Sequence, residues 1–236
     1  IQKAIEMIIT FVFEKFFLDC SHGFRPGRSC HTALKHLQLK AGNASTYSWV
    51  IEGNIKECFN NISHDMILKG LKRKINCPAT FNLIKRILSA GYILNEDLKK
   101  VGRKNSKVYK SNIGVTQNIV LSPLFSNIAL YELDEFINHE LKKEFSMGKQ
   151  QKPNLIYRRL RYRIKRENDL RKKRVLINNC LKVLSKNFHD SDYKKLFYVR
   201  YADDWVILVA GSLKDAEIIC NKVSDKLQSL GLTLNI

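Results

Sequence analysis

The sequence has no long apolar run, no closely paired cysteines and few acidic residues. No apolar stretch reaches the roughly 18 residues that a membrane-spanning helix needs, so we expect no membrane partner. None of the six cysteines belongs to a C-x-x-C pair, which indicates a reducing compartment and ordinary packing. Cys20, His22, Cys30 and His31 lie close together in the sequence, but their spacing fits no standard zinc finger. Structural packing is therefore favoured for them.

The shortage of acids leaves a large positive surplus. Lys and Arg number 41 against 22 Asp and Glu, so the formal net charge is +19. On charge alone, such a surplus favours a polyanionic partner, most often nucleic acid, with an anionic membrane as the other candidate. The lack of a spanning apolar run leaves nucleic acid as the expected partner. With 44% hydrophobic residues over 236 positions, the chain is long enough and apolar enough to bury a core.

The positive charge is concentrated in residues 152–174, which hold eleven Lys or Arg and only two acids. Such a segment repels itself unless a polyanion is present, although a solvated face is the ordinary alternative. Arginine and tyrosine together neutralise phosphates and stack on unpaired bases. Here Tyr157 and Tyr162 alternate with four arginines, which we expect to contact RNA: Arg158, Arg159, Arg161 and Arg163.

Hydrophobic periodicity predicts an α+β fold, with a helical first quarter followed by a small sheet with helices against it. The predicted helices, the first of them largely buried, cover residues 4–18, about 30–40, 63–74, 78–90, 121–145 and 212–229. Strands are predicted at 47–55, as a pair within 195–211, and at the final LTLNI, and a hairpin is plausible at 91–112.

Asp203 and Asp204 lie within one of the most apolar stretches, FYVRYADDWVILVAG at 197–211. Because the flanking strands are predicted to be buried, the acid pair is predicted at a hairpin tip. Adjacent carboxylates raise each other's pKa unless a cation lies between them, and their oxygens suit Mg²⁺. On the tetrapeptide YADD (201–204) alone, a metal site and a solvent-exposed Asp-Asp turn are equally plausible.

Four segments occur in a diagnostic order: SHGFRPGRSCHTAL (21–34), IEGNIKECFNNI (51–62), GVTQNIVLSPLFSNIALYELD (114–134) and YVRYADD (198–204). In this order they resemble the reverse transcriptase domain of group II intron-encoded proteins, the maturase family, and the mitochondrial branch is most similar. The resemblance implies a right-hand polymerase fold, with helical fingers and a small antiparallel palm sheet. It divides one domain into fingers (about 1–46), a mainly palm part (about 47–236) and a basic insert (150–188). Neighbouring motifs of the family are absent, so we expect a piece of a longer protein.

The resemblance also implies a two-metal site, and this sequence departs from the family there. Three carboxylates hold the metals in the family, and Asp203 and Asp204 match two of them. The third position is Asn54, which keeps a neutral oxygen but loses a negative charge. We therefore expect polymerase activity to be weakened or lost.

Other matching positions carry implied roles. Phe59 and Gln117 match residues at the nucleotide site, although Phe59 has a core role as its alternative. Thr116 and Asn118 replace a Pro and a Gly of the family pattern around Gln117, and Asn118 is expected to crowd a close backbone approach. Two further residues are candidates for template phosphate contacts, or else solvated loop charges: Arg25 and Arg28.

The resemblance implies an RNA-binding protein that assists the splicing of its own intron RNA, with Mg²⁺ as its cofactor if the polymerase is active. A DNA primer or target and deoxynucleotides (dNTP) are further partners that it implies. An active RNA-directed DNA polymerase supporting intron mobility, and a non-functional remnant of a mobile element, are the alternatives. The resemblance favours a mitochondrial location, with another organelle as the alternative, and the oligomeric state stays open.

Overall fold

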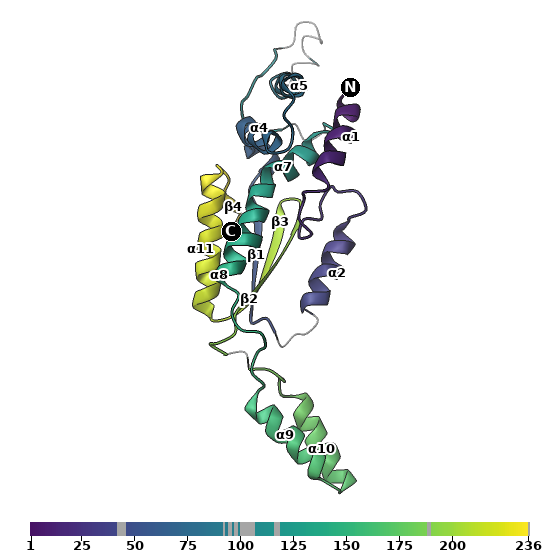
Figure 1. Cartoon of the computed structure of the whole chain (residues 1–236), viewed down its shortest axis with the longest axis vertical. Coiled ribbons are helices and arrows are strands. Elements are labelled where there is room, and N and C mark those ends of the chain that lie inside the picture. Colours follow the sequence, from purple (N-terminus) through teal and green to yellow (C-terminus); the bar gives the residue numbers. More distant parts are fainter. Residues whose placement is uncertain are drawn as a thin grey trace.

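A computed structural model describes residues 1–41, 46–91, 107–115, 119–187 and 190–235, with the single positions 93, 96 and 99. It confirms the predicted α+β class, since helices pack against one small antiparallel sheet (Figure 1). Among the described residues, every helix is too short or too polar to cross a lipid bilayer. The helices are α1 (Gln2–Phe13), α2 (Cys30–Ala41), α3 (Cys58–Asn61), α4 (His64–Lys72), α5 (Pro78–Leu88), α7 (Ser122–Glu135), η1 (Phe136–Leu141), α8 (Lys142–Glu144), α9 (Leu155–Arg166), α10 (Leu170–Leu181) and α11 (Leu213–Ser229).

The sheet contains four antiparallel strands in the order β2-β3-β1-β4. Strands β2 and β3 form a hairpin, β1 lies beside β3, and the short β4 lies outside β1. Their bounds are β1 (Trp49–Ile55), β2 (Lys195–Tyr201), β3 (Asp204–Ala210) and β4 (Leu234–Asn235).

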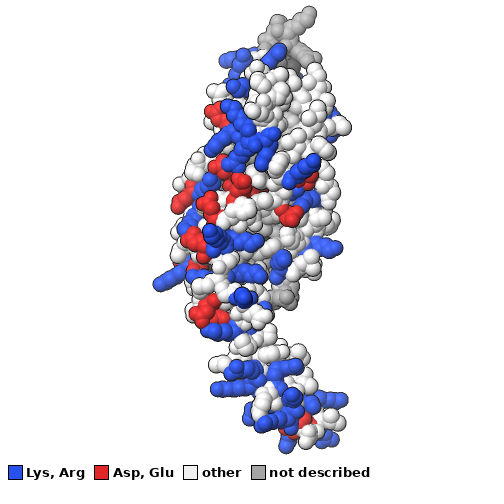
Figure 2. Space-filling model, viewed as in Figure 1, with Lys and Arg blue, Asp and Glu red and all other residues white. Residues whose placement is uncertain are grey.

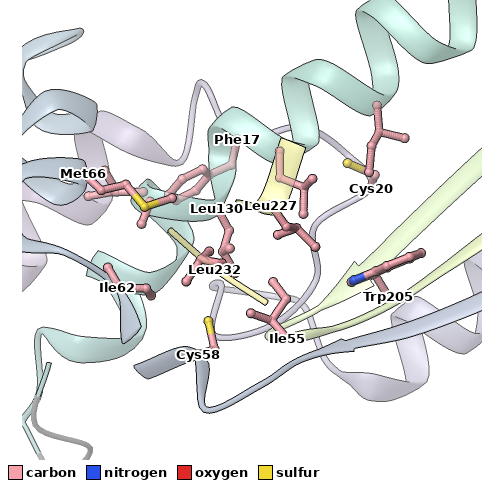
Figure 3. Close-up of a cluster of buried hydrophobic side chains, with 14 of the residues drawn as sticks. Phe17, Cys20, Ile55, Cys58, Ile62, Met66, Leu130, Trp205, Leu227 and Leu232 are labelled. Atoms are coloured by element: carbon pink, nitrogen blue, oxygen red, sulfur yellow. The ribbon is translucent and has the colours of Figure 1, made fainter. Parts of the chain in front are cut away.

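One face of the sheet carries the main hydrophobic core. Side chains alternate along a strand, so Trp205, Ile207 and Val209 of β3 all point to this face, where they form one cluster with buried side chains of α7 and α11. Figure 3 shows Trp205 together with Leu130 of α7 and Leu227 of α11. Gly53 of β1 allows the Trp205 ring to lie flat across the strand, because a Cβ at Gly53 would come within 2.2 Å of that ring. The core therefore depends on a large and a small residue placed opposite each other.

The second face of the sheet is covered only in part. Helix α2 packs its Ala33 against Phe197, Val199 and Leu208, which come from β2 and β3. The β1 side of this face carries no described helix, and Val50 there is 60% exposed. The sheet thus presents an open surface along β1 and the beginning of β3.

Two helix predictions need refinement. Residues 121–145 do form one continuous helical run, but its middle, η1, is π-helical. The first helix was predicted to be largely buried, which is wrong for α1. Only Ile9 and Phe13 of α1 are buried, whereas Met7, Ile8 and Phe11 are more than half exposed. The hairpin suggested for 91–112 lies mostly outside the described residues.

Residues Leu155–Leu181, which we call the arm, form an antiparallel helical hairpin of α9 and α10 that projects from one end of the molecule (Figure 1). A narrow two-stranded ribbon joins the arm to the sheet. Met147 pairs with Lys194, and nearer to the arm Pro153 pairs with Lys186. The sequence predicted the basic character of this segment but not its two helices.

Candidate functional site

The acid pair lies at the tip of the β2–β3 hairpin, as predicted. Tyr201 pairs with Asp204 across the hairpin, so the connecting turn consists of Ala202 and Asp203. Ala202 has a φ of +57°, an uncommon left-handed conformation for a residue with a side chain. Asp203 is half-buried, and Asp204 is exposed.

Asn54 lies directly opposite Asp204 in the β1–β3 register. The Asn54 side-chain amide donates a hydrogen bond to Oδ1 of Asp204 at a distance of 2.5 Å. Both side chains belong to the open face of the sheet, on the side that α2 does not cover. The three positions expected to form one site are therefore brought together, although they are 150 residues apart in the sequence.

The donor atoms at this place suit a divalent cation held by two ligands of the chain. Asp203 and Asp204 supply two carboxylates, while Asn54 supplies an amide whose N–H is directed at Asp204. Within the described residues, no three His, Cys, Asp or Glu side chains are grouped closely enough to hold a metal ion. Mg²⁺ commonly binds one or two carboxylates and completes its coordination with water and phosphate, so two carboxylates on an exposed turn fit such an ion.

A fully buried ion pair lies beneath this turn. Arg200 donates from Nε to Oδ1 of Asp134 at 2.8 Å and from Nη2 to Oδ2 at 2.7 Å, and both side chains are 0% exposed. Tyr198 also donates its hydroxyl to Asp134. Burial alone would lower the pKa of Arg200, but the Asp134 carboxylate outweighs it and raises that pKa, so the guanidinium stays charged.

The same guanidinium holds the turn itself. Nη1 of Arg200 donates to the Ala202 carbonyl at 2.7 Å and to Oδ1 of Asn127 at 3.1 Å, and Nη2 donates to Ser21. Sequence reasoning missed this network. One sequence signal could have indicated it. Side chains alternate along β2, and this alternation points the charged side chain of Arg200 into the core.

The loop before α2 packs against the other side of the turn. Asn127 donates its side-chain amide to the Gly23 carbonyl at 2.8 Å. A Cβ at Gly23 would lie 2.3 Å from the Ala202 backbone nitrogen, so only glycine allows this close approach. The motif around Gly23 therefore helps to shape the acid-bearing turn.

Arg25 is not available for the phosphate contact expected from the sequence. Its side chain is 2% exposed and forms an ion pair with Glu14 at 2.7 Å. It also donates to the carbonyls of Leu18 and Ser21, so its donors are used within the fold. Arg28 forms an ion pair with Asp19 and keeps 22% of its side chain exposed, so its phosphate contact stays a prediction.

The two residues expected at the nucleotide site differ in how far the structure describes them. Phe59 is half-buried on α3, packs beside the main core, and meets the ring of Phe24 edge-on at 6.1 Å. A role at a nucleotide therefore stays a prediction for Phe59. Gln117, with its neighbours Thr116 and Asn118, lies outside the described residues.

A pair of histidines lies near Arg28. His22 approaches Thr32 through Nδ1 at 2.9 Å and His36 through Nε2 at 3.3 Å. Burial lowers the pKa of His22 to about 4, and the positive charges of Arg28 and His36 contribute. Both imidazoles are therefore neutral near pH 7, since burial also lowers the pKa of His36.

The basic candidates of the insert all lie on α9 of the arm. Tyr157 is half-buried, on the side of α9 that carries the other partly buried residues of that helix. Tyr162 is 55% exposed. The guanidinium of Arg166 lies 4.2 Å from the centre of the Tyr162 ring. Lys and Arg side chains are spread over the arm (Figure 2). Four of them are the exposed arginines predicted to contact RNA: Arg158, Arg159, Arg161 and Arg163.

Comparison with known proteins gives a family for most of the chain. Residues 1–155 match the family model described as reverse transcriptase (RNA-dependent DNA polymerase). Over its whole length, the chain is 36% identical to a Schizosaccharomyces pombe protein described as an uncharacterized 91 kDa protein in a cob intron, and it covers 28% of that protein. It is 37% identical to the group II intron-encoded protein LtrA of Lactococcus lactis, over 93% of this chain and 36% of that one.

A more distant relative and a solved structure agree with these matches. Nuclear intron maturase 1, mitochondrial, of Arabidopsis thaliana is 22% identical over 95% of this chain and 35% of its own length. The structure of telomerase from Candida tropicalis superposes on 99% of this chain and 32% of that chain, with a TM-score of 0.56 and 12% identity, which shows a shared fold. The chain spans about a third of the length of these relatives.

Proposed function

Because the chain belongs to the reverse transcriptase (RNA-dependent DNA polymerase) family, we propose that it is the fingers and palm part of a group II intron maturase. It binds its intron RNA and helps that RNA to reach its splicing-competent fold, and its polymerase activity is weak or lost. The observation that carries this proposal is the hydrogen bond from Asn54 to Asp204. It puts a neutral amide where a third carboxylate is expected.

Asp203 and Asp204 would hold Mg²⁺ on the open face of the sheet. A bound Mg²⁺ would supply the positive charge that stabilises a phosphate during its transfer. Asn54 adds no negative charge to the ion, and its N–H is directed at one oxygen of Asp204. The residues of this site therefore bind metal less strongly than three carboxylates would.

RNA binding draws on the arm and the net charge of +19. Arg158, Arg159, Arg161 and Arg163 are exposed on α9, where they can neutralise phosphates of the intron RNA. The relatives named for cob introns and for mitochondrial intron maturation favour a mitochondrial location. Deoxynucleotides and a DNA primer or target are partners only if polymerase activity remains.

An active polymerase that supports intron mobility is the second candidate. The observation in its favour is that Asp203 and Asp204 are retained on a turn that Arg200 fixes from below. A non-functional remnant is the third, and a reading frame that breaks directly after residue 236 would favour it.

Two assays on the full-length protein separate these candidates. We expect the unchanged protein to bind and splice its intron RNA while extending a primer poorly. Asn54→Asp should raise primer extension by about a hundredfold or more, because a third carboxylate restores charge beside the metal. Asn221→Asp, an exposed substitution on α11, is the matched control. Vigorous extension by the unchanged protein, with no gain in Asn54→Asp, would contradict the proposal.

A further inference from the structure

The arm carries far more positive charge than its own acids can balance. Residues 155–181 contain ten Lys or Arg and two acids. Asp169 caps α10 by accepting the N–H groups of Arg171 and Lys172, and Glu167 accepts the N–H of Asp169. In the part of the chain that the structure describes, no Lys or Arg of the arm forms an ion pair with a carboxylate. The cations of the arm are therefore open to an external polyanion.

A hollow of about 620 Å³ lies between the end of α9 and the beginning of α10. Its lining combines a flat aromatic ring, aliphatic side chains and three cations. Glu167 is the one acid of this lining, and its carboxylate accepts the backbone N–H of Asp169 within the loop. The other lining residues are Tyr162, Arg163, Arg166, Lys172, Val175 and Leu176.

These side chains suit a nucleobase that is joined to a phosphate. The guanidinium of Arg166 lies over the ring of Tyr162. Tyr162 nevertheless remains 55% exposed, and Val175 is 59% exposed. An aromatic ring beside exposed aliphatic carbon offers a stacking surface, and the nearby cations offer phosphate contacts. In double-stranded RNA the base faces are covered by their neighbours, so only an unpaired base can use such a surface.

We propose that this hollow binds an unpaired base of a looped or single-stranded RNA. The base stacks on Tyr162 beside Val175, and Arg163 and Lys172 hold the adjoining phosphates. The inference rests on the proposed function, since it specifies which RNA feature the arm recognises. The proposal assigns the recognition of unpaired bases to Tyr162. The arginines outside the hollow attract RNA of any structure through the negative charge of the RNA backbone.

The test compares two RNAs that bind to the full chain. One is a stem with a loop of unpaired bases, and the other is the same stem as a blunt duplex of equal charge. Binding is measured by fluorescence anisotropy at fixed salt. The chain should prefer the looped RNA, and Tyr162→Leu should weaken that binding about tenfold while leaving duplex binding unchanged. Tyr162→Phe keeps the ring and should bind as the unchanged chain does.

Arg161→Gln is the control for charge alone, because Arg161 is exposed on α9 but does not line the hollow. It should weaken both RNAs equally. Circular dichroism of each variant checks that the helices of the arm remain folded. Equal effects of Tyr162→Leu on both RNAs, or an effect on neither, would overturn the inference while leaving RNA binding intact. Failure of the unchanged chain to bind either RNA would instead overturn the proposed function as well.

Discussion

Arg200 is the residue on which the geometry of the acid pair depends. It joins the buried Asp134 to the carbonyl of Ala202, so one guanidinium connects the core to the turn. Removing one member of a buried ion pair leaves the other charge without compensation, which commonly costs about 3–5 kcal/mol. The pair thus ties the position of Asp203 to the integrity of the core.

We expect Arg200→Met to lower the free energy of unfolding by about 3–5 kcal/mol, because Asp134 would remain buried and charged. Equilibrium urea unfolding followed by circular dichroism measures the loss. The double variant Arg200→Met with Asp134→Leu removes both charges and should recover a large part of it. A double variant as unstable as the single one would show that the lost packing, not the stranded carboxylate, causes the effect.

His22 makes the stability of the fold sensitive to acid. Its neighbours are Arg28, His36, Arg25 and Asp19, and burial is the main cause of its low pKa of about 4. An unfolded chain protonates this histidine near pH 6.5. Between these values the unfolded state binds more protons than the folded state, so stability falls as the pH falls.

Between pH 7 and pH 5, we expect His22 to contribute a loss of about 1–2 kcal/mol in the free energy of unfolding. The His22→Asn variant should lose that part of the pH dependence, as measured by urea unfolding at each pH. The exposed His31 is the control, and His31→Asn should keep the dependence of the unchanged chain. An unaltered slope in His22→Asn would argue against this assignment.

At the scale of elements, local sequence signals predicted most of the secondary structure. Ser212 caps α11 and Ser63 caps α4, since each serine side chain accepts a backbone N–H of its helix, and serine is a preferred residue at that position. The two strands flanking the acid pair are mostly buried, as expected. These features follow from side-chain chemistry within a few residues, which a sequence displays directly.

Features that depend on tertiary contacts were harder to predict. The burial of Arg25 depends on Glu14, eleven residues earlier, and a basic loop gives no sign of that partner. The two helices of the arm carry so many charges that their sequence indicates only a basic segment and does not predict the helices. Asn54 was expected beside the acid pair through the resemblance, but only the register of β1 and β3 shows its amide donating to Asp204.

At the scale of the whole molecule, positive charge is divided between the arm and the body that carries the sheet. The arm begins and ends close together, because the Asn154 N–H donates to the Ser185 carbonyl at 3.0 Å. Its helices pack mainly against each other, and Cys180 is the one residue of α9 and α10 that is buried. The arm is thus arranged as an appendage whose loss leaves the main core intact.

Replacing residues 155–181 by a short Gly-Ser linker should leave the melting temperature of the remaining chain within a few degrees of its original value. The same deletion should weaken RNA binding and reduce its dependence on salt, because fewer counterions are released when fewer cations meet phosphate. Titrations at several salt concentrations measure that slope. A slope unchanged by the deletion would mean that the arm does not meet RNA. A large drop in melting temperature would mean that the arm supports the body.

The ribbon at the foot of the arm runs directly into β2, whose seven residues end at the turn that carries Asp203. An extended strand of that length measures roughly 23 Å, and a helix of twelve residues adds roughly 18 Å. The tip of the arm therefore lies farther from the acid pair than the roughly 40 Å that these two elements span, because the ribbon lies between them (Figure 1). Under the proposed function, an RNA contacts the acid pair and the arm together only when its two contacted features are spaced by a matching distance. Spacing then becomes a criterion of selection in addition to sequence and charge.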